Sequence, residues 1–198
     1  MRSRGLSPDK VHDARFAPSY YKRPAVVFAL RDEKGKLIGL NGRRLDNYGV
    51  TTLTVGRVGI YVTSPDVFES AVVAICEAPI DALTIWQASA IPAVALCGTR
   101  LPEWLPRKLS GKHVFVATDS DKAGNNAAVM LVRRLEPLSV RCVRLNFTPA
   151  KDANELGTQV LGERLKLAVN GAGNLDGMAV SVTPADIGRV GRGRTMNL

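Results

Sequence analysis

The sequence contains few cysteine, histidine and tryptophan residues. There are three cysteines, two histidines and two tryptophans among 198 residues. Cys76, Cys97 and Cys142 are odd in number, widely spaced and embedded in apolar segments, which favours reduced core thiols over a disulfide framework or a zinc site. The two histidines, His12 and His113, form no ligand cluster, and we interpret them as surface or hydrogen-bonded side chains rather than catalysts.

Long apolar runs are also missing. The longest apolar stretches, 71–76 and 91–97, are far shorter than the roughly 20 residues that a transmembrane helix needs. Residues 1–10 carry charges but are not followed by an apolar segment, so they do not resemble a secretory signal. The sequence therefore predicts no membrane span and, by default, a cytoplasmic location.

Acidic residues are scarcer than basic ones. The chain has 18 Asp and Glu against 27 Lys and Arg, a formal net charge of +9. This surplus favours anionic partners, nucleic acid among them, although a basic surface can also serve solubility alone. Neither a GxxxxGK[ST] loop nor a GxGxxG turn after a strand is present, so any phosphate group would have to be bound by metal and side chains.

The chain is long enough for one ordinary α/β domain with a small appendage. Residues 1–23, rich in Arg, Lys, Ser and Pro, predict an irregular N-terminal arm. Residues 24–69 predict a small β-rich subdomain. Its expected strands are 25–30, 36–40, 50–55 and 58–62. Residues 170–198, with repeated Gly and Arg, predict a flexible basic tail.

From about residue 70 the pattern changes to short apolar runs that alternate with helical periodicity, which is typical of βαβ units. We therefore predict an α/β domain over residues 70–169, in which a parallel sheet is flanked by helices and preceded by the small, mostly β subdomain. The expected strands are 71–76, 93–97, 113–118 and 140–145, and the expected helices are 79–87, 123–135 and 158–169.

Acidic residues follow two of the predicted strands. Glu77 comes directly after 72–76, and Asp119 comes directly after 113–118, with Asp121 two residues further on. In a doubly wound sheet, ligand sites lie beyond the carboxyl ends of the strands. Carboxylate oxygens are the ligands that Mg²⁺ prefers. The sequence therefore predicts a divalent-metal site at this edge of the sheet.

Asp81 extends this prediction, because it lies four residues after Glu77 and therefore on the same face of the helix, one turn along. It could support the first metal or bind a second. Structural alternatives exist for each residue, since Asp121 could cap the helix that begins near Ala123, and Glu77 and Asp81 could complement a helix dipole. Each feature alone is weak, and the two strand ends together favour a site.

Three segments resemble the Toprim domain, which bacterial DnaG-type primases, phage primase-helicases, topoisomerases and some nucleases share. The segment Val73-Ala-Ile-Cys-Glu-Ala-Pro-Ile-Asp-Ala82 resembles the family's strand that ends in Glu, with Asp four residues later. The segment Ala117-Thr-Asp-Ser-Asp-Lys-Ala-Gly124 resembles its strand followed by DxDxAG. The segment Lys151-Asp-Ala-Asn-Glu-Leu156 resembles the KDxNE motif of phage and mobile-element primases.

The preceding β segment resembles the small N-terminal subdomain of primase cores. Arg31-Asp-Glu-Lys-Gly35 and Leu40-Asn-Gly-Arg-Arg44 are similar to its RDxxG and GR signatures. The chain departs from the family in lacking a zinc finger, a P-loop helicase region and a clear copy of the Lys-Tyr-Leu-Asn-Ser stretch. The missing modules and stretch indicate a different mode of template engagement or the need for a partner. Asn154 also stands where DnaG-type proteins often have an acid, although phage-type relatives resemble this chain there.

The resemblance implies a primase of a phage, plasmid or integrated element that makes short primers on single-stranded DNA from nucleoside triphosphates, with Mg²⁺ or Mn²⁺ as cofactor. A replicative helicase or a zinc-finger protein is the implied partner. A stand-alone Toprim nuclease and a non-catalytic nucleic-acid-binding module remain as alternatives. The implied catalytic and metal-binding residues are Glu77, Asp119 and Asp121, with Asp81 and Asp152 in support, and the implied phosphate contacts are Arg43, Arg44, Arg57, Lys122 and Lys151.

Overall fold

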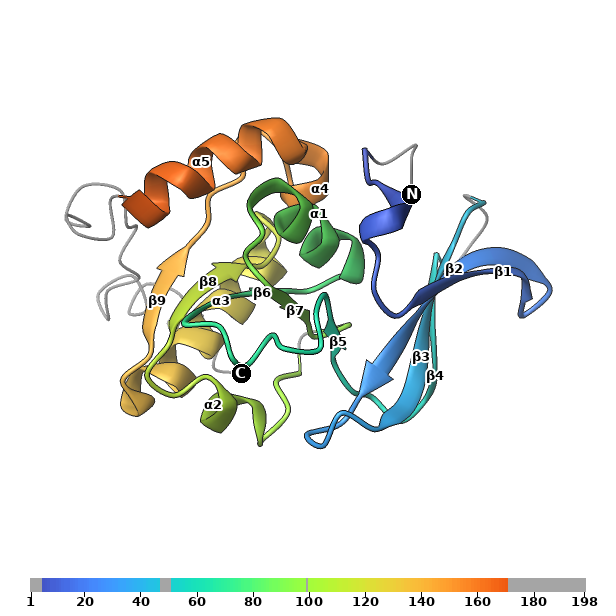
Figure 1. The fold of residues 1–198 in the computed structure, drawn as a ribbon, viewed down its shortest axis with the longest axis horizontal. Coiled ribbons are helices and arrows are strands. Elements are labelled where there is room, and N and C mark those ends of the chain that lie inside the picture. Colours follow the sequence, from blue (N-terminus) through green and yellow to red (C-terminus); the bar gives the residue numbers. More distant parts are fainter. Residues whose placement is uncertain (1–4, 47–50, 99, 171–198) are drawn as a thin grey trace, which may run out of the picture.

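The computed structural model describes residues 5–46, 51–98 and 100–170, which form two β-sheets lying next to each other (Figure 1). One is a four-stranded antiparallel sheet, and the other is a five-stranded, mostly parallel sheet covered by helices. This arrangement confirms the predicted fold class. The predicted basic tail lies outside the described residues from residue 171 on.

The smaller sheet has the strand order β1-β2-β3-β4, with each neighbouring pair antiparallel. Its strands are β1 (Ala14–Tyr20), β2 (Arg23–Arg31), β3 (Leu37–Arg44) and β4 (Thr52–Gly56). The predicted hairpin between β2 and β3 is confirmed. Its turn forms because the Asp32 carboxylate accepts hydrogen bonds from the backbone N–H groups of Lys34 and Lys36, both at 3.0 Å.

The predicted irregular arm was wrong for residues 14–20, which form β1 at the edge of the smaller sheet. Most β1 side chains are exposed or partly exposed, and Pro18 interrupts the strand, so the segment lacks the apolar alternation that marks a strand in a sequence. Upstream of β1, Leu6 is buried, and the backbone of Ser7 exchanges two hydrogen bonds with the Gln87 side chain. The first described residues therefore pack against the main domain.

The larger sheet has the order β5-β7-β6-β8-β9, with β5 antiparallel to its neighbour and the other pairs parallel. Its strands are β5 (Tyr61–Val62), β6 (Val72–Cys76), β7 (Ala93–Ala95), β8 (His113–Ala117) and β9 (Arg141–Arg144). The strand expected at 58–62 in the small subdomain was therefore misassigned. Only its last two residues form a strand, which pairs with β7 of the larger sheet, whereas Ile60 makes an isolated antiparallel bridge to Arg31 of β2.

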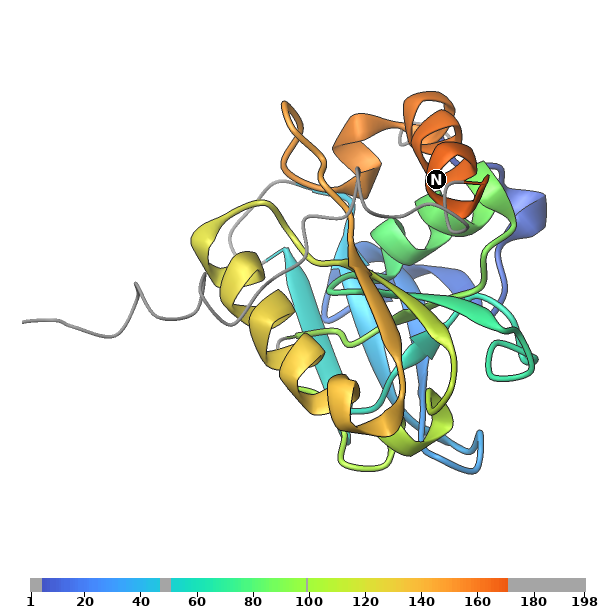
Figure 2. The ribbon, with the colours of Figure 1, turned by 90° about the vertical axis from the view of Figure 1, so that its left-hand side faces the viewer.

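Helices cover both faces of the larger sheet (Figures 1 and 2). Helices α1 (Pro79–Ser89), α4 (Ala153–Leu156) and α5 (Thr158–Asn170) lie on one side, and α2 (Leu105–Lys108) and α3 (Lys122–Leu135) lie on the other. Within the described residues, two single-turn 3₁₀ helices, Pro8–Lys10 and Glu136–Leu138, complete the elements. Along β6, Ala74 and Cys76 join the core with α1 and α5, whereas Val73 and Ile75 join the core with α3. Burial on both faces explains why these strands read as continuous apolar runs.

None of the helices in the described part of the chain is long and apolar enough to cross a membrane.

The two sheets are joined through Phe28 of β2 and Tyr61 of β5, whose rings meet edge to face with centroids 5.2 Å apart. Both side chains are fully buried. This shared core holds the smaller sheet against the larger one, next to the carboxyl ends of its parallel strands.

Candidate metal centre

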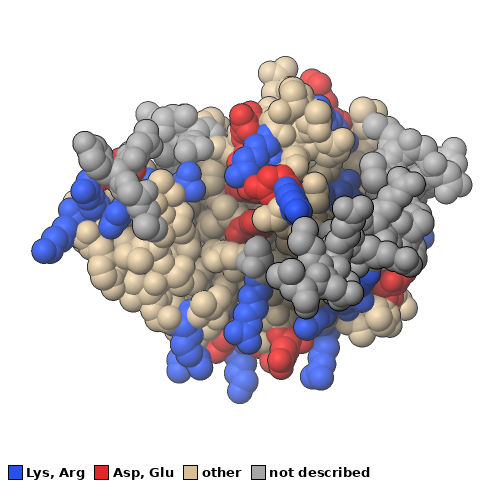
Figure 3. All heavy atoms as spheres, turned by 180° about the vertical axis from the view of Figure 1, so that it is seen from behind, with Lys and Arg blue, Asp and Glu red and all other residues tan. Residues whose placement is uncertain are grey.

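A pocket of about 370 Å³ lies between the smaller sheet and the carboxyl ends of the parallel strands. The larger sheet and its helices contribute its acidic side, and β2, β3 and β4 contribute the opposite side. Acidic side chains gather in the middle of the face seen from behind, with Lys and Arg side chains around them (Figure 3). The lining residues include Phe28, Asn41, Arg43, Thr52, Glu77, Asp81, Cys97, Asp119, Lys151, Asp152 and Asn154.

Three carboxylates meet in this pocket. Asp81, Asp119 and Asp152 each offer one oxygen atom, and the three atoms lie within 4.8 Å of one another. Asp81 is only 6% exposed, and the other two are partly buried. A set of hard oxygen donors fits Mg²⁺ or Mn²⁺ and does not fit soft metals that prefer thiolates. The group can therefore hold a divalent ion of the predicted kind.

The segment around Asp152 is tied to helix α1. Asp152 is the N-cap of α4, and its Oδ1 accepts a hydrogen bond from the Glu155 N–H at 2.7 Å. The Asn154 N–H donates to Asp81 Oδ1 at 3.0 Å, and the Asn154 amide donates to Thr84 Oγ1 at 3.0 Å. The bond to the buried Asp81 carboxylate comes from the Asn154 backbone, whereas the bond to Thr84 needs the side-chain amide, because an ionised acid at this position has no hydrogen to donate.

Asp119 and Asp121 lie close together, as the extended backbone between them predicts. Lys151 Nζ is 3.0 Å from Asp119 Oδ2 and 3.7 Å from Asp121 Oδ2. Asp121 also caps α3, because its Oδ1 accepts a hydrogen bond from the Gly124 N–H at 2.8 Å, and this bond lowers the pKa of Asp121. Asp121 is exposed and does not line the pocket, so its capping role and its nearness to Asp119 coexist.

Glu77 lies at the end of β6 inside the same pocket but outside the group of three carboxylates. Its Oε1 accepts a hydrogen bond from the Asp119 N–H at 3.3 Å. Burial raises the pKa of Glu77, and the negative charge of Asp119 raises it further. Burial and the neighbouring Asp119 charge therefore favour the protonated form of Glu77.

Comparison with known proteins identifies a family for the acidic side of this pocket. Residues 74–157 match the Toprim-like family model. These residues are a Toprim-like domain. No curated protein sequence matches the chain.

Solved structures of primases share the fold. The primase fragment of the bacteriophage T7 primase-helicase is 20% identical with a TM-score of 0.57, over 86% of this chain and 68% of that one. The Aquifex aeolicus primase (zinc-binding and RNA polymerase domains) is 19% identical with a TM-score of 0.64, over 86% and 54%. A DnaG primase catalytic domain solved with single-stranded DNA is 19% identical with a TM-score of 0.66, over 85% and 69%. At these identities the likeness concerns the fold.

Arg144, at the end of β9, is a residue of the Toprim-like domain that the sequence did not indicate. Its guanidinium donates hydrogen bonds to the backbone oxygens of Thr118 at 2.7 Å and Asp119 at 2.8 Å, to Thr118 Oγ1, and to Asn125 Oδ1 at 3.2 Å. It therefore holds the backbone from which Asp119 projects, and its charge lies near Glu77 and Asp119. No motif marks it, and only its place at a strand end gives a hint.

The predicted phosphate contacts divide into two groups. Arg43 and Lys151 line the pocket, whereas Arg44, Arg57 and Lys122 are not among its lining residues. Asn41 was missed, although it lies within the GR signature, and it is buried with its amide donating to Thr54 Oγ1 at 2.9 Å. The smaller sheet thus presents one cation and one buried amide to the acidic residues.

Asp81 should make the stability of the Toprim-like domain depend on pH. Burial, with a contribution from the Asp152 charge, raises the pKa of Asp81 from 3.8 to about 7. Since the folded pKa lies above the unfolded one, ionised Asp81 destabilises the fold increasingly as pH rises between these values. In EDTA, we expect Asp81→Asn to be more stable than the parent at about pH 8, with a gain about 2 kcal/mol larger there than at about pH 5.

Urea unfolding at the two pH values measures this difference. The matched control is Asp66→Asn, because Asp66 is exposed and does not line the pocket. An equal change in stability for Asp81→Asn at both pH values would contradict the assignment of a buried, high-pKa carboxyl group to Asp81.

Proposed function

We propose that this chain is a primase-type nucleotidyltransferase that makes short primers on single-stranded DNA from nucleoside triphosphates, with Mg²⁺ or Mn²⁺ as cofactor. The observation that carries the proposal is the side of the acidic pocket that the smaller sheet forms. Arg43, Asn41 and Thr52 of the smaller sheet face the same cavity as Asp81 and Asp119. A nuclease needs only the Toprim acids, whereas a polymerising enzyme must also hold an incoming nucleotide opposite them.

The acidic residues divide the proposed chemistry among themselves. Asp81, Asp119 and Asp152 would hold the divalent ion, with Asp121 at the rim. When bound, such an ion neutralises the triphosphate and the charge that develops in the transition state. Glu77 accepts the proton of the attacking hydroxyl, a task that suits its raised pKa.

The basic residues bind phosphate in this proposal. Arg43 and Lys151, which line the pocket, contact the triphosphate. Arg44, Arg57 and Lys122, which lie outside it, contact the template backbone. A DnaG primase catalytic domain of similar fold was solved with single-stranded DNA, which supports a template of this class. A helicase or a zinc-finger protein would supply template selection.

The test is incorporation of labelled ribonucleotides on single-stranded DNA templates in the presence of Mg²⁺ or Mn²⁺, with and without a replicative helicase. We expect short products that depend on template, nucleotide and metal. Cleavage of a supplied nucleic acid without any such product, on every template tried, would reject priming in favour of a Toprim nuclease.

Lys151 gives a more specific prediction, since its ammonium group lies between Asp119 and Asp121 and also lines the pocket. Lys151→Met removes a cation that competes with the metal and that neutralises phosphate. We expect Mn²⁺ to bind several-fold more tightly without nucleotide, and KM for the nucleoside triphosphate to rise about tenfold or more, the usual scale for a charge-assisted contact.

Calorimetric titration of Mn²⁺ and steady-state kinetics measure the two effects. Lys166→Met is the matched control, because Lys166 is exposed on α5 and does not line the pocket. If Mn²⁺ bound more weakly to Lys151→Met, Lys151 would have to act as a support for Asp119 rather than as its competing counter-ion.

A further inference from the structure

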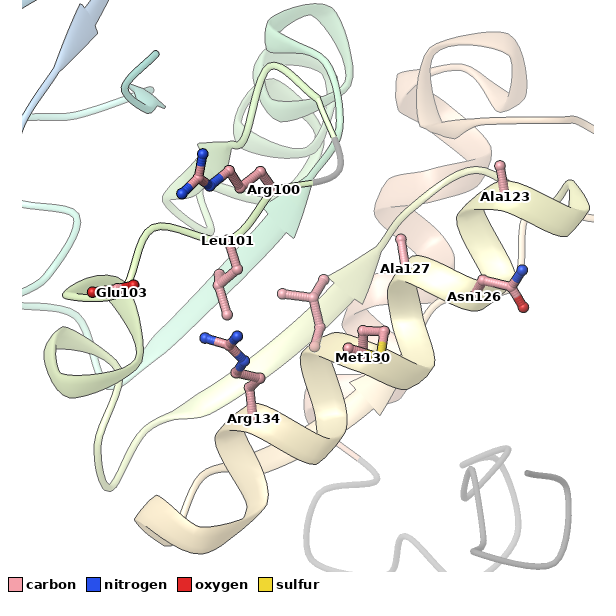
Figure 4. A pocket seen from close by; sticks show the side chains of 9 residues that line it. Arg100, Leu101, Glu103, Ala123, Asn126, Ala127, Met130 and Arg134 are labelled. Carbon is pink, nitrogen blue, oxygen red and sulfur yellow. The ribbon is translucent and has the colours of Figure 1, made fainter. Parts of the chain in front are cut away.

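A groove separate from the acidic pocket lies between α3 and the segment that follows β7 (Figure 4). Its volume is about 460 Å³. Leu101 and Arg134 face each other across it, and Met130 lies on the helix beside them. The groove begins next to the Toprim acids, because Arg100 follows the pocket-lining residue Gly98 closely in the chain.

Helix α3 presents to this groove a stripe that the fold does not need. Its buried face is formed by Gly124, Ala128, Leu131 and Leu135. A neighbouring stripe lines the groove, with Ala123, Ala127, Met130 and Arg134 at the spacing of one helix face. Met130 is 55% exposed although it is a large apolar side chain. The apolar floor is therefore available to a partner.

Charge at the groove favours an acidic partner. Arg100 and Arg134 are exposed, and within the described residues neither forms an ion pair or a side-chain hydrogen bond. The single acidic residue among the lining residues is Glu103. Two exposed guanidinium groups beside an apolar floor match a ligand that alternates carboxylates with apolar side chains.

Nucleic acid and the chain's own C-terminal segment are the alternative occupants, and nucleic acid fits this groove less well. The lining residues include no aromatic side chain on which a base could stack. Residues 171–188 contain two aspartates and no basic residue, so they are the competing occupant, and peptide binding seen only with a chain that ends at residue 170 would overturn the proposal in favour of this segment.

We propose that the groove between α3 and residues 100–103 is a docking site for an acidic peptide segment with apolar side chains, contributed by a partner protein. Its apolar residues pack on Leu101, Ala127 and Met130, and its carboxylates pair with Arg100 and Arg134. The helix-in-groove mode suits a stripe of this length, because residues 123–134 span three turns of α3. Such a partner would be held next to the acidic pocket.

The test uses the full chain and a fluorescein-labelled peptide of about 12 residues that combines Leu and Phe with Asp and Glu, a length matched to the stripe. Two control peptides replace the acids by Lys or the apolar residues by Ser. We expect fluorescence anisotropy to show binding of the acidic apolar peptide alone. Arg134→Glu and Met130→Asp should each weaken it by about tenfold or more.

Arg133→Glu is the matched control variant, because Arg133 is the adjacent exposed residue of α3 and does not line the groove. It should leave peptide binding within about twofold of the parent. Equal loss in Arg133→Glu and Arg134→Glu would overturn the proposal in favour of general charge attraction. No binding of the acidic apolar peptide, or selective loss of oligo-dT binding in Arg134→Glu, would also overturn it, the latter in favour of a nucleic-acid track.

Discussion

Asp119→Asn will reduce metal-dependent primer synthesis by a factor on the order of 10³ or more, while affinity for single-stranded DNA will stay within about twofold. Asp119 belongs to the group of three carboxylates whose oxygens lie within 4.8 Å, and it also contacts Lys151 at 3.0 Å. An amide has the same shape but lacks the negative charge that holds a divalent ion. DNA affinity depends instead on contacts between basic side chains and phosphates.

The experiment compares primer synthesis, Mn²⁺ binding and the salt dependence of DNA binding in the parent and the variant. Asp66→Asn serves as the control for loss of an exposed carboxylate and should keep full activity. Parental activity in Asp119→Asn would refute the site. If the parent makes no primers but binds Mn²⁺, and Asp119→Asn loses that binding, then the metal site is correct and the proposed function is wrong.

Gly124→Ala will destabilise the fold by about 3 kcal/mol and abolish Mn²⁺ binding. A methyl group at Gly124 would lie 2.1 Å from the backbone oxygen of Asp119 and 2.7 Å from its carbonyl carbon. Both atoms belong to the backbone that Arg144 holds, so relief requires the end of β8 and the first turn of α3 to move apart. Asp119 projects from that junction and would be displaced with it.

Urea unfolding and Mn²⁺ titration measure the two effects. Arg133→Ala is the control, because it places alanine at an exposed position of the same helix, where the expected change is within about 0.5 kcal/mol. A stable Gly124→Ala variant with parental Mn²⁺ affinity would show that the junction tolerates separation. The glycine of the DxDxAG motif would then have no steric role here.

The strands that carry the site were predictable from the sequence because burial on both faces requires a continuous run of apolar residues. The apolar runs before Glu77 and Asp119 correspond to β6 and β8, and the helical periodicity after them corresponds to α1 and α3. Carboxyl ends of neighbouring parallel strands meet at one edge, so the approach of Glu77 to Asp119 followed from these assignments.

The strands at the edges of the two sheets have weaker sequence signals. Strand β1 exposes most of its side chains and contains a proline, so nothing in residues 14–20 distinguished it from an irregular arm. Tyr61 and Val62 have strand-forming side chains, but only the packing against β7 decided which sheet they join. In both cases the hydrogen-bonding partner lies outside the segment, so local propensity could not select it.

The sequence by itself determined the α/β class, the acids at the two strand ends and the Toprim motifs, because each depends on the order of residues within a short segment. Only the tertiary structure decided that Asp152 lies beside Asp81, that Arg144 holds the backbone of Asp119, and that Arg43 faces the pocket whereas Arg57 does not. These contacts join segments distant in the chain. Their geometry depends on how the helices and the two sheets pack, which local periodicity does not encode.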